Sequence, residues 1–417
     1  MQRFYFIFFC IYLQNCVSVC SLNLENEKKP LFPLTESNND VLETQNNAYP
    51  LEFPKFFCSL FKVPSSLKIE SVDEEPQATV YDDAAQQLGG LRTPKNCSCI
   101  PTYEEYAKSI NEAWARLNSI SLSKIKEWTH IHITPHTINR VKVVFYPFGG
   151  PDIVYAIKFF PLASDYILVG LEPLGDFINI EKNLQNKSTF AALKYAFSHY
   201  LRKGYFITSE MMTQLYNKDI KGALYLILLE LAKLGFRIIS VENLSINADG
   251  QEVARETGMI NCVKITFARS GSPFLRKAYY IKTDLSNSNK KLSYLLNFIK
   301  RRRFATFVKS ASYAMHNREF SGIRDFILNN TQSLLQDDSG IPFYHFNFGW
   351  DKYIFGEYTQ PTLPIFRPFK QQNLAHYYAT HDKAEIPFNI GYGFEQGRPN
   401  LLLAIPCRIS DNEVNTR

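Results

Sequence analysis

Short apolar runs and amphipathic segments alternate along the chain from about residue 102 to residue 405. Runs rich in Val, Ile, Phe and Tyr are typical of strands, whereas apolar residues spaced three or four apart indicate helices. The strands predicted in this way are residues 141–148, 165–171, 236–241, 260–267, 278–283, 305–310, 333–336, 352–358 and 401–405. The predicted helices are residues 102–117, 153–160, 190–201, 223–234, 292–300 and 321–328. This alternation predicts an α/β fold with a mostly parallel or mixed sheet and helices on both faces, a Rossmann-like three-layer arrangement.

The start of the folded body is predicted from local signals. Thr102, followed three residues later by Glu105, fits a capping box at the start of a helix. Residues 74–96 have the composition of a loop, and residues 21–49 are dominated by Asn, Glu, Ser and Pro, which is typical of a flexible segment. Residues 50–67 are more apolar and are expected to dock onto the body. The predicted organisation is therefore a flexible leader over residues 21–100 with a partly apolar docking segment, and a single α/β domain over residues 101–410.

The first twenty residues have the form of a signal peptide. Arg3 precedes an aromatic-rich apolar run that ends in small residues. Cleavage after Cys20 is favoured, and the alternatives are a lipid anchor at Cys20 or an uncleaved anchor. No later segment has the roughly 20 apolar residues of a membrane span. We therefore expect an exported, soluble protein that is periplasmic, surface-bound or extracellular.

Composition adds little about partners. The chain has 417 residues, is 45% hydrophobic and carries a net charge of +6, so it is long enough to bury a sizeable core. Basic residues are spread along the chain except in the run at residues 300–303. This distribution is too diffuse for a nucleic-acid binding surface, so no nucleic-acid partner is expected. The expected partner is a small molecule or another protein.

The cysteines predict disulfides rather than a metal site. Eight are present, and in an exported protein Cys58, Cys97 and Cys99 are the candidates for pairing. The alternative, thiolate ligation of a metal, would require C-x-x-C spacing, which the C-x-C pair lacks.

One local unit has the form of a cofactor site. A strand is followed by Gly149, Gly150, Pro151 and Asp152, then by a helix, a second strand and Glu172. This unit resembles the start of a class I methyltransferase, and the resemblance implies that Glu172 would hold the ribose of S-adenosylmethionine. The unit departs from that family in lacking G-x-G, in placing Asp152 in the turn, and in two successive predicted helices after Glu172. The structural alternative is a tight corner in which Pro151 begins the helix and Asp152 stabilises the helix dipole. This alternative is favoured, because a glycine pair without the rest of the motif is weak evidence for a nucleotide site.

Acidic residues also follow several other predicted strands. Because the carboxyl ends of parallel strands meet at one edge, the sequence predicts a shared acidic rim there, which binds a ligand or a divalent metal, or shares protons. A metal-assisted hydrolase is an alternative that uses the same carboxylates. The other alternative is that these residues are ordinary turn and cap formers. The candidate rim residues are Asp152, Glu172, Asp284, Asp337 and Asp338.

Two further groups are weaker candidates. His130 and His132 are predicted on one face of a strand, where two imidazoles can bind zinc, although surface or packing roles are the default. His316 is a candidate base with Ser310 or Ser312 as nucleophile, but no G-x-S-x-G elbow is present.

Four motifs give a wider resemblance. YPFGGPD, GLEPLG, FVKSASYAMH and LLQDDSGIPF are similar to an uncharacterised family of exported bacterial proteins. The resemblance covers about residues 100–405 and implies export and a single shared domain. It implies no activity and no catalytic role for any residue.

Overall fold

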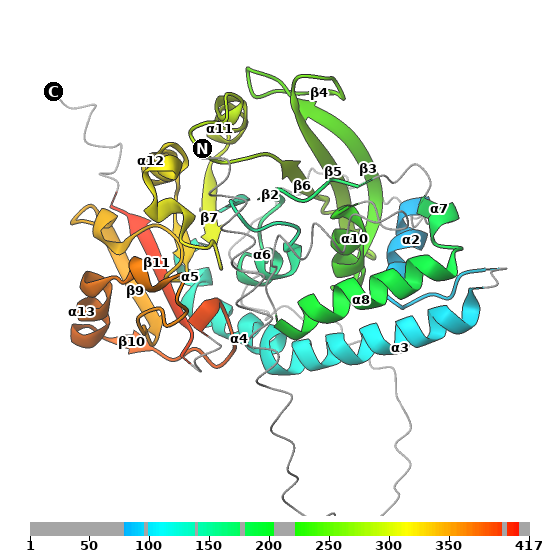
Figure 1. The fold of residues 1–417 in the computed structure, drawn as a ribbon, viewed down its shortest axis with the longest axis horizontal. Coiled ribbons are helices and arrows are strands. Elements are labelled where there is room, and N and C mark those ends of the chain that lie inside the picture. Colours follow the sequence, from blue (N-terminus) through cyan, green and yellow to red (C-terminus); the bar gives the residue numbers. More distant parts are fainter. Residues whose placement is uncertain are drawn as a thin grey trace, which may run out of the picture. The chain divides into compact units, whose positions relative to one another are not determined.

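The computed structural model describes residues 79–95, 99–137, 141–175, 180–203, 222–393 and 398–407. All of these residues lie within one compact unit, Gln77–Arg417 (Figure 1). The predicted signal peptide, Cys20, Cys58, Cys97 and the docking segment at residues 50–67 lie outside the described residues.

In the described residues, eleven strands form one sheet in the order β10-β9-β11-β8-β7-β1-β2-β6-β5-β3-β4. The predicted three-layer α/β fold is thereby confirmed. The strands are β1 (Val143–Tyr146), β2 (Asp165–Gly170), β3 (Phe236–Ile246), β4 (Glu252–Ala254), β5 (Ile260–Arg269), β6 (Arg276–Lys282), β7 (Phe304–Val308), β8 (Leu334–Gln336), β9 (Trp350–Gly356), β10 (Lys383–Ala384) and β11 (Asn400–Pro406).

Five central strands, in the order β8-β7-β1-β2-β6, are parallel to one another. β1 lies at their centre, with β2 on one side and β7 on the other. The chain winds outward in one direction from β1 to β2 and in the other from β7 to β8, so β1 and β7 meet at a topological switch point. Antiparallel strands flank this core, with β11 between β8 and β9 on one side and β5 against β6 on the other.

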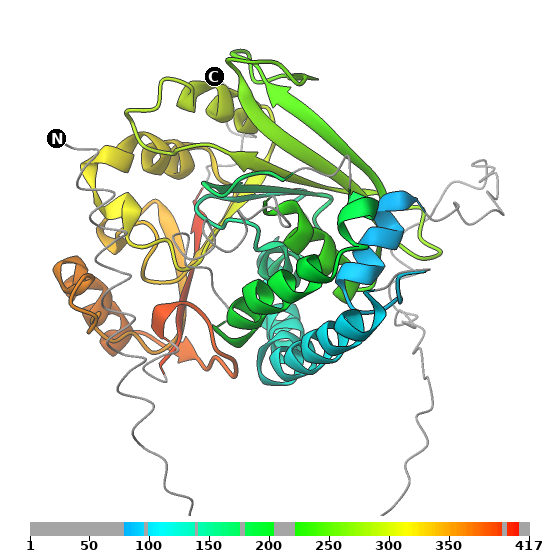
Figure 2. The same cartoon turned by 45° about the vertical axis from the view of Figure 1, so that its right-hand side comes forward.

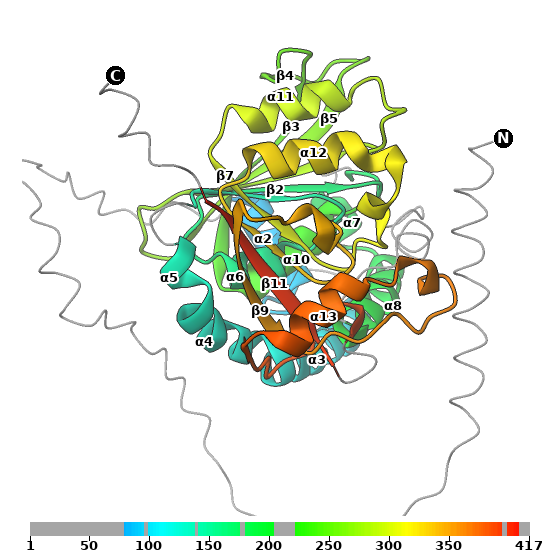
Figure 3. The same ribbon diagram turned by 90° about the vertical axis from the view of Figure 1, so that its left-hand side faces the viewer.

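Helices cover both faces of the sheet. The alternation of side chains along β1 shows the division, because Val144 and Tyr146 belong to one apolar core and Val143 and Phe145 to the other. Figure 3 shows α11 and α12 on one face and α6 and α10 on the other. The longer helices are α2 (Val80–Leu88), α3 (Ile100–Leu117), α4 (Ser123–His132), α6 (Ile153–Phe159), α8 (Lys187–Lys203), α10 (Leu224–Lys233), α11 (Leu292–Lys300), α12 (Ser321–Asn330) and α13 (Gln372–Thr380). The shorter ones are η2 (Asn118–Leu122), α5 (Thr134–Thr137), α7 (Ile180–Asn183), η3 (Ala314–His316), η4 (Arg318–Phe320), η5 (Phe343–His345) and η6 (Arg367–Phe369).

A helix that precedes β1 packs against a helix that follows β2. α3 and α8 lie side by side (Figures 1 and 2), and the Tyr103 and Tyr106 rings of α3 pack against Phe190 of α8 with centroids 5.0 and 5.3 Å apart. None of the helices in the described residues is long and apolar enough to cross a membrane.

Three local predictions are wrong. The loop predicted around residue 80 contains α2, whose Ala84, Ala85 and Leu88 are buried. The predicted capping box at Thr102 does not form, because α3 begins two residues earlier, at Ile100. The predicted strand with His130 and His132 is the end of helix α4, which buries Ile125, Trp128 and Thr129 at helical spacing.

Candidate functional site

The turn after β1 is a tight corner against the sheet. A Cβ atom on Gly149 would lie 2.6 Å from the Tyr146 ring, so only glycine fits there. Gly150 has φ of +56° and its N–H donates to Val169 O at 3.1 Å. Asp152 is the N-cap of α6, because its Oδ1 accepts from Tyr155 N at 3.3 Å. The corner thus forms, but Pro151 precedes the helix instead of starting it.

Asp152 also makes a buried ion pair across the switch point. Lys309, the residue after β7, places Nζ 2.7 Å from Asp152 Oδ2, with the two side chains 2% and 1% exposed. The same oxygen accepts from the Tyr146 hydroxyl at 3.1 Å, and Nζ lies 3.5 Å from the centroid of the Tyr155 ring. Sequence reasoning missed Lys309, although its position directly after a parallel strand was a usable signal.

Glu172 lies at the end of the neighbouring strand and faces the glycine corner. Its Oε2 accepts from the Tyr280 hydroxyl at 3.0 Å. Burial, together with the charge of Glu172 and this hydrogen bond, raises the pKa of Tyr280. A Cβ atom built on Gly150 would lie 3.5 and 3.7 Å from the two carboxylate oxygens of Glu172. The carboxylate after β2 and the glycine turn after β1 are therefore in direct apposition, as the nucleotide-binding interpretation requires.

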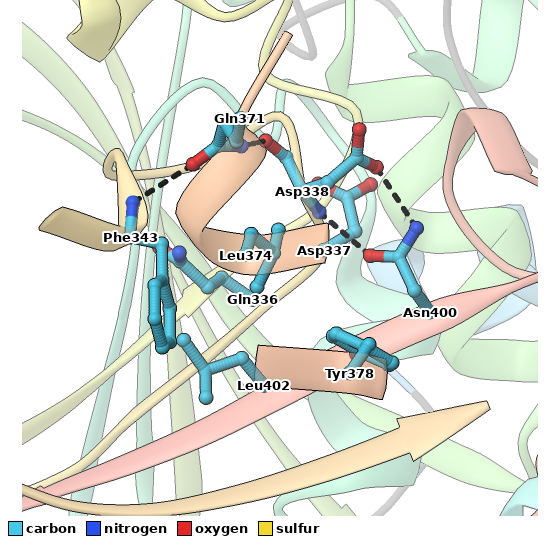
Figure 4. Close-up of a pocket in the computed structure, with 9 residues that line it drawn as sticks. All are labelled: Gln336, Asp337, Asp338, Phe343, Gln371, Leu374, Tyr378, Asn400 and Leu402. Atoms are coloured by element: carbon cyan, nitrogen blue, oxygen red, sulfur yellow. Dashed lines mark hydrogen bonds between the residues drawn. The ribbon is translucent and has the colours of Figure 1, made fainter. Parts of the chain in front are cut away.

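The remaining acidic pair lies beyond β8 (Figure 4). Asp337 accepts from Ser310 N at 2.8 Å and from Ser339 N at 3.0 Å, while Asp338 accepts from the Tyr313 hydroxyl and from Asn400 Nδ2 at 3.0 Å. Burial and the adjacent Asp338 raise the pKa of Asp337 to about 7. Burial also raises the pKa of Asp338. Each carboxylate is thus held by donors from other elements, and the pair favours an added proton.

The loops at the switch point are conformationally strained. Phe148 after β1 has φ of 60°, and Ser310, Ser312 and Tyr313 after β7 have φ of 52°, 52° and 56°. Non-glycine residues adopt such values infrequently, and clusters of them are found preferentially at functional sites. The strain is therefore located where an α/β sheet of this winding binds its ligand.

The predicted acidic rim does not form one cluster. Asp284 is exposed and accepts from Ser286 N at 2.9 Å and Ser286 Oγ at 2.6 Å, while the other four carboxylates are buried and separately partnered. In the part of the chain that the structure describes, no group of three or more His, Cys, Asp or Glu side chains is placed to hold a metal ion. A cavity of about 10 Å³ beside Asp337, Asp338 and Asn400 has room for roughly one water molecule. Within the described residues, the rim carboxylates therefore do not converge on one cation position.

The weaker candidates are also separated. His130 is exposed, whereas the ring of His132 packs 5.1 Å from Trp128 and 5.5 Å from Phe355, because positions two apart on a helix do not share a face. Among the described residues, no hydrogen bond joins the hydroxyl of Ser310 or Ser312 to His316; Ser312 Oγ instead lies 3.2 Å from the Tyr392 hydroxyl.

Of the predicted disulfide residues, Cys99 is buried and disulfide-bonded. Its pairing stays a prediction, because both candidate partners lie outside the described residues.

Comparison with protein-family models and with curated proteins finds no match for this chain. A fold of this class supports many unrelated activities, so function has to be argued from the residues of the site.

Proposed function

We propose that the protein binds a ribose-containing small molecule without phosphate groups, with S-adenosylmethionine as the first candidate, at the corner formed by Gly149, Gly150 and Glu172. The observation that carries the proposal is the apposition of the Glu172 carboxylate to Gly150. A carboxylate at the end of the second strand accepts hydrogen bonds from ribose hydroxyls, and the glycine turn allows close approach of the backbone.

The sheet supports this assignment. The parallel order β6-β2-β1-β7-β8 corresponds to strand order 3-2-1-4-5 of a doubly wound sheet. The two helices after Glu172 and the β3–β5 hairpin are followed by β6, which pairs in parallel with β2. The departure seen in the sequence is thus an insertion before the third parallel strand.

The charges at the corner select the type of ligand. Carboxylates already occupy two N-terminal amides of α6, since Ile153 N donates to Glu230 Oε2 at 3.2 Å and Tyr155 N to Asp152 Oδ1. A pyrophosphate needs those amides, so a dinucleotide is disfavoured. A neutral nucleoside or a sulfonium cation has no such conflict. Since Glu172 is buried and faces Gly150, a ligand has to displace this side chain or the turn on binding.

Calorimetric titration and thermal unfolding of the protein with S-adenosylmethionine, S-adenosylhomocysteine, adenosine and NAD test this function. The three adenosyl compounds should bind and NAD should not; at 100 times its dissociation constant a ligand stabilises the native state by about 2.7 kcal/mol. Glu172→Gln should weaken binding at least about tenfold, because a ribose hydroxyl loses a charged acceptor. Asp284→Asn is the matched control, since Asp284 follows β6 but is exposed. Lack of binding by every adenosyl compound would refute the proposal, and binding without methyl transfer would define a binding module.

A further inference from the structure

Basic side chains gather at the edge of the sheet opposite the candidate site. The register of the strands places Phe304, Val143, Asp165 and Lys277 in one row across the starts of four parallel strands. Arg303 and Lys142 directly precede two of these strands, and Arg276 begins the fourth. β5 is antiparallel to β6, so Arg269 at its end lies at the same edge. We call this set, with Lys158 in the last turn of α6, the basic edge.

The cations of the basic edge act on one another, and Lys277 also interacts with the charge of Asp165, its partner in the sheet register. Beyond the effect of burial, Lys126 and Arg269 lower the pKa of Lys158, and Arg276 lowers that of Arg269. Of the nearby acids, Glu252 is already paired with Lys264 and Arg302, and Asp165 is half-buried. In the described residues no ion pair joins a carboxylate to Lys142, Lys158, Arg269, Arg276, Lys277 or Arg303.

Exposed apolar side chains adjoin these charges. Phe274 and Leu275, in the turn that leads into β6, are 78% and 56% exposed. Leu162, in the turn between α6 and β2, is 58% exposed. Single exposed apolar residues are common on protein surfaces, but here they lie in the two turns that flank the basic edge, where Arg269 and Arg276 pack over the Phe236 ring.

We propose that the basic edge, with Leu162, Phe274 and Leu275, docks on the surface of a bilayer that contains anionic phospholipid. Cations are attracted to lipid phosphates over a Debye length, and short apolar side chains insert at the headgroup boundary. A nucleic acid would also attract the cations, and Phe274 offers one ring for base stacking, but Leu162 and Leu275 are aliphatic and offer none. The combination of the basic edge with two aliphatic side chains and one aromatic side chain therefore favours lipid. This surface is opposite the candidate ligand site, so docking leaves that site accessible.

The test is flotation of the full chain with vesicles of phosphatidylcholine alone and with 30 mol% phosphatidylglycerol. Binding should be stronger to the anionic vesicles and should weaken with added salt. The variant Lys142→Gln/Arg269→Gln/Lys277→Gln/Arg303→Gln should weaken it at least about 100-fold, since each cation contributes on the order of 1 kcal/mol at such a surface. Phe274→Ser/Leu275→Ser should weaken it at unchanged charge. The residues before the described unit are identical in all variants, so any binding through them cancels.

A matched control removes four exposed cations elsewhere: Lys95→Gln/Lys187→Gln/Lys370→Gln/Lys383→Gln. This control has the same net charge as the quadruple variant of the basic edge, but it should bind the anionic vesicles as strongly as the unmodified chain does. Thermal unfolding checks that all variants fold. Equal loss in the control would show a nonspecific charge effect and overturn the proposal. It would also be overturned by equal binding to both vesicle types, or by tight binding to single-stranded DNA that the Phe274 and Leu275 substitutions leave unchanged.

Discussion

Lys309 Nζ lies 2.7 Å from Asp152 Oδ2, with both side chains almost completely buried. The pair joins the residue that follows β7 to the N-cap of α6, which follows β1, and so connects the two loops of the switch point. Its attraction compensates for the loss of hydration only while both partners are present, because an unpaired charge in this position would remain desolvated.

Removal of one partner is therefore expected to be strongly destabilising. Lys309→Met should lower the free energy of unfolding by about 3–5 kcal/mol, as for other buried pairs broken on one side, and urea unfolding measures this. Arg398→Met is the control, because Arg398 and Glu357 form a pair at 3.7 Å that is more than half exposed and should contribute less than about 1 kcal/mol. The double variant Asp152→Asn/Lys309→Met should lose less free energy of unfolding than the sum of the losses in the two single variants. Similar small losses at both pairs would contradict a buried charge interaction.

Asp337 should make the protein less stable as pH rises. Burial and Asp338 raise its pKa to about 7 in the folded protein, whereas an aspartate in the unfolded chain titrates near pH 4. The folded state therefore binds more protons between about pH 4 and pH 7, and stability is greatest below this range and is lost as pH rises through it, with a slope of at most about 1.4 kcal/mol per pH unit. Asp337→Asn should remove this contribution, measured by urea unfolding at several pH values. Asp284→Asn, which alters an exposed carboxylate, should leave the pH dependence parallel to that of the unmodified chain.

His316 should make the protein less stable as pH falls, which is opposite to the effect of Asp337. Burial, with His345 and Arg324 nearby, lowers its pKa to about 4, below the value near 6.5 of an unfolded histidine. The stability that neutral His316 contributes is present above about pH 6.5 and is lost as pH falls toward 4, because the unfolded chain then binds an additional proton. His316→Gln should abolish this loss, and His130→Gln should not, since His130 is exposed.

The two opposite slopes overlap between about pH 4 and pH 6.5 and partly cancel in the unmodified chain. Asp337→Asn should therefore shift the slope of stability against pH upward relative to the unmodified chain, and His316→Gln should shift it downward. Shifts of the same sign in both variants would contradict the assignment.

The sequence predicted the positions of the site but not its contacts. Parallel alternation places the residues after each strand at one edge, which is why Asp152, Glu172, Asp337 and Asp338 were found from their strands. Their partners are distant in the chain: Tyr280 is 108 residues from Glu172 and Asn400 is 62 from Asp338. Such pairings depend on sheet order, and spacing along the chain does not report it.

The local errors have a different cause. α2 and the end of α4 have polar sequences with few apolar residues, so their periodicity is weak. α2 is stabilised by the burial of two alanines and Leu88, and α4 by Trp128, whose indole N–H donates to Glu385 O at 2.8 Å. Tertiary packing thus determines both segments, and propensity alone does not.

Gly149 offers the most direct test of the corner itself. A Cβ atom there would lie 2.6 Å from the Tyr146 ring, and the ring is held in place because its hydroxyl donates to Asp152. Gly149→Ala should therefore destabilise the protein by about 1–3 kcal/mol, the usual cost of overpacking, measured by urea unfolding. Gly349→Ala should change stability by less than about 0.5 kcal/mol, because its nearest neighbour would be 3.4 Å away on an exposed turn. In a Tyr146→Ala background the ring is absent, so Gly149→Ala should cost much less there than in the unmodified chain. An equal cost in both backgrounds would show that the glycine is required for its backbone conformation and not for its contact with Tyr146.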